Sequence, residues 1–265
     1  DIGMPALYAH NQFGNRVLQK VELERRVAIL KYLRQFRIGL QGPDYLFFYK
    51  PLHRNPISQI GFQIHERPAR EFMEHAKEVI KRCGTDSPEY GYIMGFICHF
   101  TLDSECHPFV AEEIERTGVG HIEIESEFEK FMMRKNGEEP LSYPVGKTFP
   151  TDTATTECIV KFYEGVNAKE ARYALKSMKN YKSFLVAPGK VKYTLLDTGM
   201  TLSGHYEELQ GHLLKPTDNS KCKESSEGLY ERFLKAIPLA EELMKAFDDY
   251  LDGAELSERF DRNFE

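Results

Sequence analysis

The sequence lacks three features that would indicate other classes of protein. It has no tryptophan, no apolar run near the ~18 residues that cross a membrane, and no long alternation of polar and apolar residues. The second absence argues against a transmembrane segment, and the third argues against a β-sheet.

An excess of positive charge is also missing. The chain carries 35 Lys and Arg against 41 Asp and Glu, a net charge of −6. Proteins that bind nucleic acid through their surface usually present a basic patch, often with aromatic rings that stack on bases. The charge balance and the absence of tryptophan therefore disfavour nucleic acid as a partner.

Paired cysteines are absent as well. Five cysteines is an odd number, and no two of them form a CxxC pair. This disfavours a disulfide framework and a zinc ribbon, and favours a reducing compartment. No basic segment followed by an apolar run opens the chain, so we expect a cytoplasmic protein, with secretion after removal of a signal peptide as the alternative. We expect Met4 to be the native start and residues 1–3 to be an added remnant.

What the sequence does contain is helical periodicity over most of its length. With 41% hydrophobic and 29% charged residues, it is typical of a globular protein with a full core. We predict a single all-α domain over residues 1–265, with metal-site residues within 10–125 and residues 138–265 completing the helical bundle. The segments predicted to be helical are 5–21, 22–40, 56–84 with a break near Pro68, 87–107, 120–137, 167–185 and 229–253. Gly84 is expected to end the third of these segments, and Ser87 to cap the start of the fourth. The segments 42–56 and 138–168 are expected to be irregular.

The segment "CHFTLDSECHPF", residues 98–109, places three polar side chains in an apolar helix. His99, Asp103 and His107 are spaced four apart and therefore share one helix face. Burying an unpaired carboxylate is costly, and a metal ion would compensate its charge. Pro108 is expected to end or bend this helix.

Other histidines and carboxylates of the first 125 residues fit the same interpretation. His121 and Glu125 form a second pair spaced four apart, and imidazole nitrogen and carboxylate oxygen are the usual ligands of catalytic zinc. The full candidate set exceeds what one tetrahedral ion needs and so favours a multinuclear site: His10, Asp44, His65, His99, Asp103, His107, His121 and Glu125.

These motifs carry a resemblance to a known family. The segments "GPDYLFFYK", "FQIHERP", "CHFTLDSECHPF" and "GHIEIESEF" resemble the zinc-dependent phospholipase C family, whose all-α superfamily also contains the P1/S1-type single-strand nucleases. The family pattern His…Asp…His…His-x-x-x-Asp…His…His-x-x-x-Glu is matched in order, within residues 4–135.

The resemblance implies two or three zinc ions. The implied ligand groups are Asp44, His65, His99 and Asp103; His107, His121 and Glu125; and His10 with Asp103, which bridges. In the family an N-terminal tryptophan completes the third group. This chain has no tryptophan, so its third site, near His10, departs from the family pattern.

The function implied by the resemblance is zinc-dependent hydrolysis of a phosphodiester, in a phospholipid or a related small phosphoester. Zinc lowers the pKa of water toward ~7 and neutralises charge on phosphorus, and Asp44 is a ligand that would also accept a proton. Two alternatives stay open: a single-strand nuclease or nucleotidase of the P1 type, and a non-catalytic helical protein with structural metals. An HD-type phosphohydrolase is disfavoured because no His-Asp dipeptide occurs.

The remaining histidines and the aromatic run have simpler interpretations. The aromatic residues that follow Asp44 are more often core anchors than a substrate wall. His53 and His75 are predicted to be surface residues, and His205 with His212 forms only a weak candidate metal pair. The aromatic residues concerned are Tyr45, Phe47, Phe48 and Tyr49.

Overall fold

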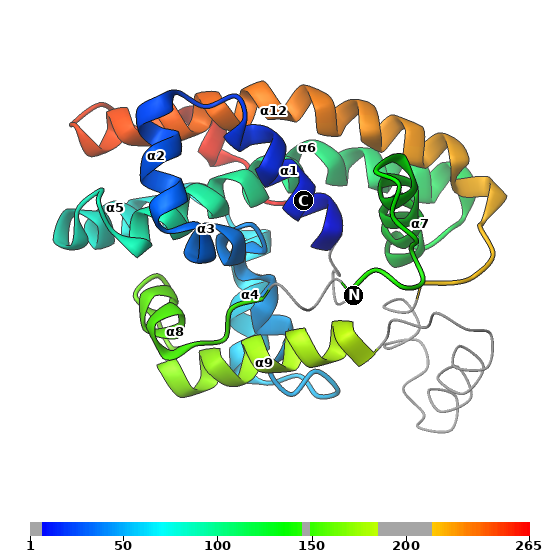
Figure 1. Cartoon of the computed structure of the whole chain (residues 1–265), viewed down its shortest axis with the longest axis horizontal. Coiled ribbons are helices and arrows are strands. Elements are labelled where there is room, and N and C mark those ends of the chain that lie inside the picture. The colour runs from blue at the N-terminus through cyan, green and yellow to red at the C-terminus, as the bar shows by residue number, and fades with distance from the viewer. Residues whose placement is uncertain (1–6, 145–148, 185–213) are drawn as a thin grey trace.

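The computed structural model describes residues 7–144, 149–184 and 214–265, and in these ranges the chain is all-helical, with no strand (Figure 1). This confirms the all-α prediction for the described part of the chain. None of the described helices is both long enough and apolar enough to cross a membrane.

Helix α6 (Pro88–Thr117) is the central element, and it is buried along most of its length. Ser87 caps it as predicted by accepting from the Tyr90 amide, and it ends at Gly118, whose φ is +71°. Contrary to the prediction for 87–107, the helix continues beyond Pro108 for more than two turns.

The continuation past Pro108 has a local explanation. Proline has no backbone N–H, so the carbonyl of Ser104, four residues earlier, loses its helical partner. Arg262 donates to that carbonyl at 2.5 Å and so replaces the missing bond. A distant side chain therefore satisfies the helix at the point where its sequence predicts an end.

The predicted helix 22–40 is wrong in one respect, because it is two helices. α1 (Leu7–Leu18) is followed by α2 (Leu23–Lys31) and α3 (Leu33–Gly39), and Tyr32 between the last two leaves helical geometry at φ −124° and ψ 42°. The break turns α3 onto α6 (Figure 1).

Small residues allow α3 and α6 to pack backbone against backbone. A Cβ added to Gly39 would lie 2.3 Å from the Tyr92 carbonyl oxygen, and one added to Gly95 would lie 2.2 Å from that of Phe36. Only glycine permits this approach. The contact fixes the position of the segment that follows α3.

That segment was expected to be an irregular loop over 42–56, but its first half is a buried 3₁₀-helix, η1 (Gly42–Phe48). Helix α9 (Ala168–Phe184) and helix α4 (Pro56–Glu66) pack against η1. The turn that carries Asp44 is therefore held on two sides.

The predicted break near Pro68 is confirmed. α4 ends at Glu66, and α5 (Ala69–Cys83) begins directly after Pro68. Gly84 ends α5 with a φ of +81°, as its position in the sequence indicated.

Among the described residues after α6, one α-helix was not predicted. α7 (His121–Lys135) agrees with the prediction, but the expected irregular segment 138–168 contains α8 (Thr153–Val160). Asp152 caps α8 by accepting from the Thr155 amide at 3.1 Å. A run of threonines has low intrinsic helix propensity, so packing of α8 against α9 decides its state.

The remaining elements enclose the core on opposite sides. α9 lies at one side with α8, and α12 (Lys223–Leu251) lies along α6 at the other (Figure 1). Both agree with predicted helices, although α12 begins six residues before the predicted start and continues through Pro238. Short 3₁₀-helices, η3 (Ser220–Cys222) and η4 (Glu258–Asp261), flank α12.

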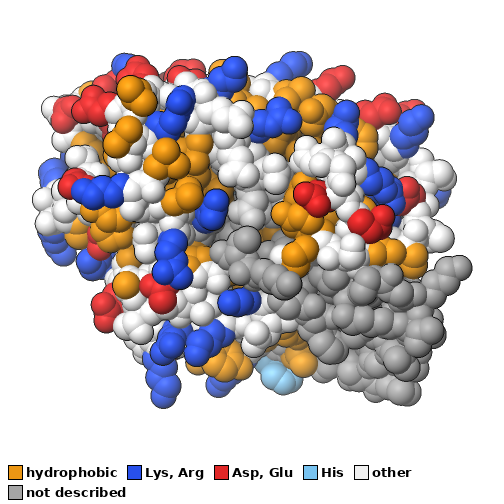
Figure 2. Space-filling model, in the orientation of Figure 1, with side chains coloured by type: hydrophobic (Ala, Val, Ile, Leu, Met, Phe, Trp, Pro, Cys, Tyr) orange, Lys and Arg blue, Asp and Glu red, His pale blue; other side chains and the backbone are white. Residues whose placement is uncertain are grey.

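The surface is mixed in charge and polarity. On the face in Figure 2, basic, acidic and apolar side chains are interspersed. Several apolar side chains lie together in the region where Figure 1 places α2. Leu23, Val27 and Leu30 of α2 are among the exposed large apolar residues.

Candidate metal centre

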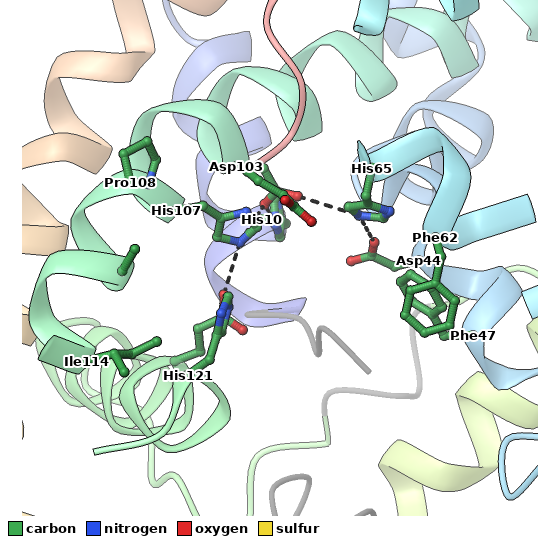
Figure 3. Close-up of a pocket in the computed structure, with 13 residues that line it drawn as sticks. His10, Asp44, Phe47, Phe62, His65, Asp103, His107, Pro108, Ile114 and His121 are labelled. Atoms are coloured by element: carbon green, nitrogen blue, oxygen red, sulfur yellow. Dashed lines mark hydrogen bonds and ion pairs between the residues drawn. The ribbon is translucent and has the colours of Figure 1, made fainter. Parts of the chain in front are cut away.

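A cavity of about 420 Å³ lies among α1, η1, α4, α6 and α7 (Figure 3). All eight predicted site residues lie at it: His99 is fully buried behind its wall, and the other seven line it. The lining residues are His10, Asp44, Phe47, Phe62, His65, Asp103, His107, Pro108, Ala111, Ile114, His121, Glu125 and Glu265.

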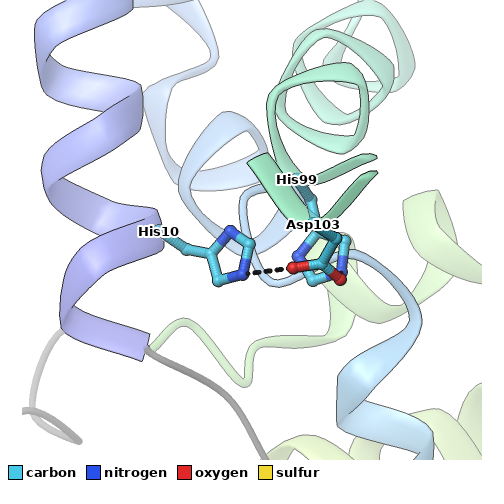
Figure 4. A group of neighbouring side chains, drawn as sticks. All are labelled: His10, His99 and Asp103. Carbon is cyan, nitrogen blue, oxygen red and sulfur yellow. Dashed lines mark ion pairs between the residues drawn. The ribbon is translucent and has the colours of Figure 1, made fainter. Parts of the chain in front are cut away.

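Asp103 is at the centre of the cluster. Its Oδ1 lies 3.0 Å from His10 Nε2, and its Oδ2 lies 3.0 Å from His99 Nε2 (Figure 4). His65 Nε2 and His107 Nε2 lie 3.9 and 3.8 Å from the same carboxylate. One carboxylate, itself 6% exposed, therefore faces four imidazole nitrogens.

Two further carboxylates flank this centre. Asp44 Oδ1 lies 3.0 Å from His65 Nε2 and 3.6 Å from His99 Nε2. Glu125 Oε1 lies 2.9 Å from His121 Nε2 and 3.2 Å from His107 Nε2. His121 and Glu125 share α7 and face His107 of α6, whereas Asp44 of η1 faces His65 of α4 and His99 of α6.

These contacts form three groups. Within each group, one nitrogen or oxygen atom of every residue lies within 4.8 Å of those of the other members. The arrangement differs from the expected one in two ways: His99 joins His10 and Asp103, and Asp103 is not in the group of Asp44, His65 and His99. The groups are His10, His99 and Asp103; Asp44, His65 and His99; and His107, His121 and Glu125. Each could hold a metal ion.

Two buried atoms near His99 fit a cation better than a hydrogen-bond network at that end of the cluster. His99 Nε2 and Asp44 Oδ1 have no hydrogen-bond partner among the described residues, although polar atoms lie 3.0–3.6 Å away. Buried polar atoms are nearly always paired. A shared metal ion requires nitrogen and oxygen atoms that converge on one point in this way, without pairing with one another.

The orientation of three histidines supports the same conclusion. His65 Nδ1 lies 2.8 Å from the Gly61 carbonyl oxygen, His99 Nδ1 lies 3.0 Å from that of Leu40, and His107 Nδ1 lies 2.5 Å from that of Phe264. A carbonyl accepts only, so the proton of each neutral ring must be on Nδ1. The Nε2 lone pair then faces the cavity, as in metal-ligating histidines.

The histidine pKa values show how strongly the carboxylates act on this cluster. Burial lowers the pKa of His99, but Asp103 and Asp44 outweigh burial and raise it to about 9. Burial likewise lowers the pKa of His107, and Asp103 and Glu125 raise it to about 10. In the absence of a metal, protons on these rings supply the compensating positive charge.

The histidines in turn lower the pKa values of the carboxylates. Burial raises the pKa of Asp103, but His99 and His107 outweigh it and hold the pKa well below the ordinary value. Burial also raises the pKa of Glu125, and His121 and His107 lower it to about 2. Both carboxylates are therefore ionised at neutral pH. Glu125 in turn raises the pKa of His121.

Gly42 leaves the space that the His99 ring needs in order to lie in the cluster. Its φ is +52°, and a Cβ there would lie 2.3 Å from Cδ2 of the His99 ring. Leu40, two residues earlier, supplies the carbonyl that orients the same ring. Glycine is thus required both by the backbone conformation and by the close approach.

We expect Gly42→Ala to lower the free energy of unfolding by about 1–3 kcal/mol, because the added methyl group overpacks the site, and to reduce metal binding. Chemical denaturation and metal analysis would measure both effects. Gly120→Ala is the matched control, because Gly120 has a φ of −70° and open space around it. Equal stability and metal content in the two variants would contradict this role of Gly42.

Sequence reasoning missed several residues that line or support the site. Within the aromatic run only Phe47 lines the cavity, whereas Tyr45 and Phe48 are buried in the core. Phe264 and Glu265 also reach the site, from the end of the sequence. No motif links these two residues to the histidines, so only the fold reveals the contact.

The four histidines outside the candidate site were predicted to be surface residues or, for His205 and His212, a weak metal pair. His53 is exposed, as predicted, and His75 Nε2 lies 2.9 Å from the Lys161 carbonyl oxygen, outside the cavity. His205 and His212 lie outside the described residues, as does the segment 1–6, on which the predicted native start and the N-terminal donor of the third site depend.

Comparison of the chain with models of protein families, with curated proteins and with solved structures finds no match.

Proposed function

We propose that this chain is a zinc-dependent phosphodiester hydrolase resembling phospholipase C, with an all-α fold of the phospholipase C and P1 nuclease type. The observation that carries the proposal is the convergence of eight imidazole and carboxylate side chains on one cavity, in three groups of metal-ligand type. A structural zinc site is closed by four protein ligands, whereas these groups border an open space.

The proposed ligands are His10, Asp44, His65, His99, Asp103, His107, His121 and Glu125. When bound, two or three zinc ions would lower the pKa of water and neutralise charge that develops on the phosphoryl group. Asp103 lies between the groups, because its carboxylate is also 3.9 Å from Nε2 of His65 and 3.8 Å from Nε2 of His107, which belong to the other two groups.

Asp44 is the proposed proton acceptor as well as a ligand. It is 4% exposed and lies in η1 at the wall of the cavity, next to Phe47. Its Oδ1 has no hydrogen-bond partner among the described residues, so this oxygen is available to a ligand or to a proton. General bases must lie within hydrogen-bond reach of the group that they deprotonate.

The walls favour a substrate with one phosphoester group and apolar surroundings. Phe47 and Phe62 lie beside Asp44 and His65, and Pro108 and Ile114 lie on the opposite side (Figure 3). No Lys or Arg is among the described residues that line the cavity. A phospholipid or a small phosphoester fits these walls better than a polynucleotide, whose many phosphates require basic contacts.

The test is hydrolysis of bis-p-nitrophenyl phosphate by the purified protein, after chelation and after zinc is restored. We expect turnover to disappear with the metal and to return with zinc. Zinc that binds and stabilises the chain without any turnover would support a structural metal site and refute the proposal. Parallel assays with short-chain phosphatidylcholine and a single-stranded oligonucleotide would distinguish a phospholipase from a nuclease.

A further inference from the structure

We propose that the segment 256–265 is a positioning element of the metal centre, which orients His107 and thereby sets the affinity of the ion held by His107, His121 and Glu125. The inference rests on the proposed zinc centre and assigns a role to a part of the chain in which no metal-ligand motif occurs. Its evidence is the way this segment is fastened to α6 and to two ligand histidines.

The segment is fastened to α6 at the turn directly before His107. Arg262 donates to the Ser104 carbonyl that Pro108 leaves free, at 2.5 Å. Arg259 donates to Ser104 Oγ at 2.8 Å and to Glu105 Oε1 at 2.5 Å. Pro108, adjacent to His107, thus creates an acceptor that the segment uses.

The start of α5 holds the segment from the other side. The Ala69 amide donates to the Arg262 carbonyl at 3.0 Å, and Arg70 pairs with Asp261. Phe260 is fully buried, and its ring stacks on Phe100 at a centroid distance of 5.5 Å. Polar and apolar contacts therefore fix the backbone immediately before Phe264.

Phe264 joins two ligand histidines from different helices. Its carbonyl accepts from Nδ1 of His107 in α6 at 2.5 Å, and its amide donates to the backbone carbonyl of His65 in α4 at 3.2 Å. Its ring is fully buried, with centroid distances of 5.2 Å to His65 and 6.1 Å to His99.

The consequence for metal binding is specific to His107. The Phe264 carbonyl holds the ring proton on Nδ1, which leaves the Nε2 lone pair directed at Glu125 and the cavity. The carbonyl groups of Gly61, in α4 itself, and of Leu40, at the end of α3, orient the rings of His65 and His99 in the same way. Only His107 depends on residues more than 150 positions away.

The test is the double variant Arg259→Ala, Arg262→Ala in the full chain. Loss of such an outer partner usually costs ~10–100-fold in metal affinity. We expect a zinc-affinity loss of about that size at the group of His107, His121 and Glu125, and little change at the group of Asp44, His65 and His99. Competition with a chelator gives the affinities, and anomalous scattering from crystals at limiting zinc gives the occupancy of each group.

A second readout follows the hydrogen bond itself. In metal-free protein labelled with ¹⁵N-histidine, we expect the Nδ1 proton of His107 to exchange with water faster in the double variant than in the wild type. Arg259→Lys, Arg262→Lys should restore slow exchange, since a lysine at either position can still donate. The matched control is Lys31→Ala, Arg34→Ala, which removes two exposed cations that do not contact the segment.

Two results would overturn the inference. One is unchanged zinc affinity and unchanged His107 exchange in the double variant. The other is an equal loss at every group, because this would mean that the segment acts only through overall stability. A wild-type chain that binds no zinc would refute the proposed function instead. The exchange measurement would still test whether the segment keeps the hydrogen bond between His107 Nδ1 and the Phe264 carbonyl in place.

Discussion

Asp103→Asn is expected to remove at least one zinc ion per chain and to abolish most phosphodiester hydrolysis. The carboxylate faces His10 and His99 at 3.0 Å and has two more imidazoles within 4 Å, so no other side chain of the site contacts as many ligands. An amide is neutral and places N–H donors where ligand oxygens are needed. The loss in zinc affinity should exceed the ~10–100-fold that outer partners cost.

The measurement is zinc per chain by elemental analysis, together with the rate of bis-p-nitrophenyl phosphate hydrolysis. Glu112→Gln is the matched control, since it makes the same chemical change at an exposed position of α6 outside the cavity. Full zinc content and full turnover in the Asp103 variant would contradict a shared metal centre.

Zinc is expected to raise the thermal midpoint of the protein by about 10 °C at pH 8. A ligand present at 1,000 times its Kd stabilises the folded state by about 4 kcal/mol, and each kcal/mol shifts Tm by ~2–4 °C in a chain of this size. Zinc binding displaces protons from histidines, so its affinity should fall as the pH is lowered.

The metal-free protein should show the opposite pH dependence on its alkaline side. The pKa values of His99 and His107 are raised to about 9 and about 10, so their contribution to stability is complete below ~6.5 and is lost as the pH rises through 9 and 10. The lowered pKa values of Asp103 and Glu125 contribute stability that is present above ~4.5 and is lost on acidification, for Glu125 through about 2.

Metal-free protein should therefore have its highest Tm between about pH 4.5 and 6.5, and the difference made by zinc should widen from pH 6 to pH 8. Calorimetric scans with chelator and with zinc across this range would measure both trends. A Tm of the metal-free protein that rises steadily from pH 6.5 to pH 10 would contradict the assigned charge balance.

Much of the candidate site could be predicted because its spacing is local. His99, Asp103 and His107 share a helix face by periodicity alone, and His121 with Glu125 repeats the pattern. Their apolar surroundings made burial of the carboxylate predictable, and with it the need for compensating charge. The all-α class followed in the same way, from helical spacing and the absence of alternation.

Helix ends and helix breaks were predicted well only where local residues decide them. Ser87, Pro68 and Gly84 act within their own turn, and all three were identified. The break at Tyr32 and the course of α6 through Pro108 depend on partners elsewhere, such as the Arg262 side chain at the Ser104 carbonyl. Such partners cannot be predicted from the helix propensities of neighbouring residues.

The sequence by itself determined the all-α class, the two histidine–carboxylate pairs spaced four apart and the residue types of the candidate centre. Only the tertiary structure decided that His10 and His65 face the α6 carboxylate and that Asp44 faces His65. It alone also decided that Phe47, of its aromatic run, lines the cavity and that Phe264 orients His107. The physical reason is that periodicity sets which side chains share a face, whereas contacts between distant segments depend on how the whole core packs.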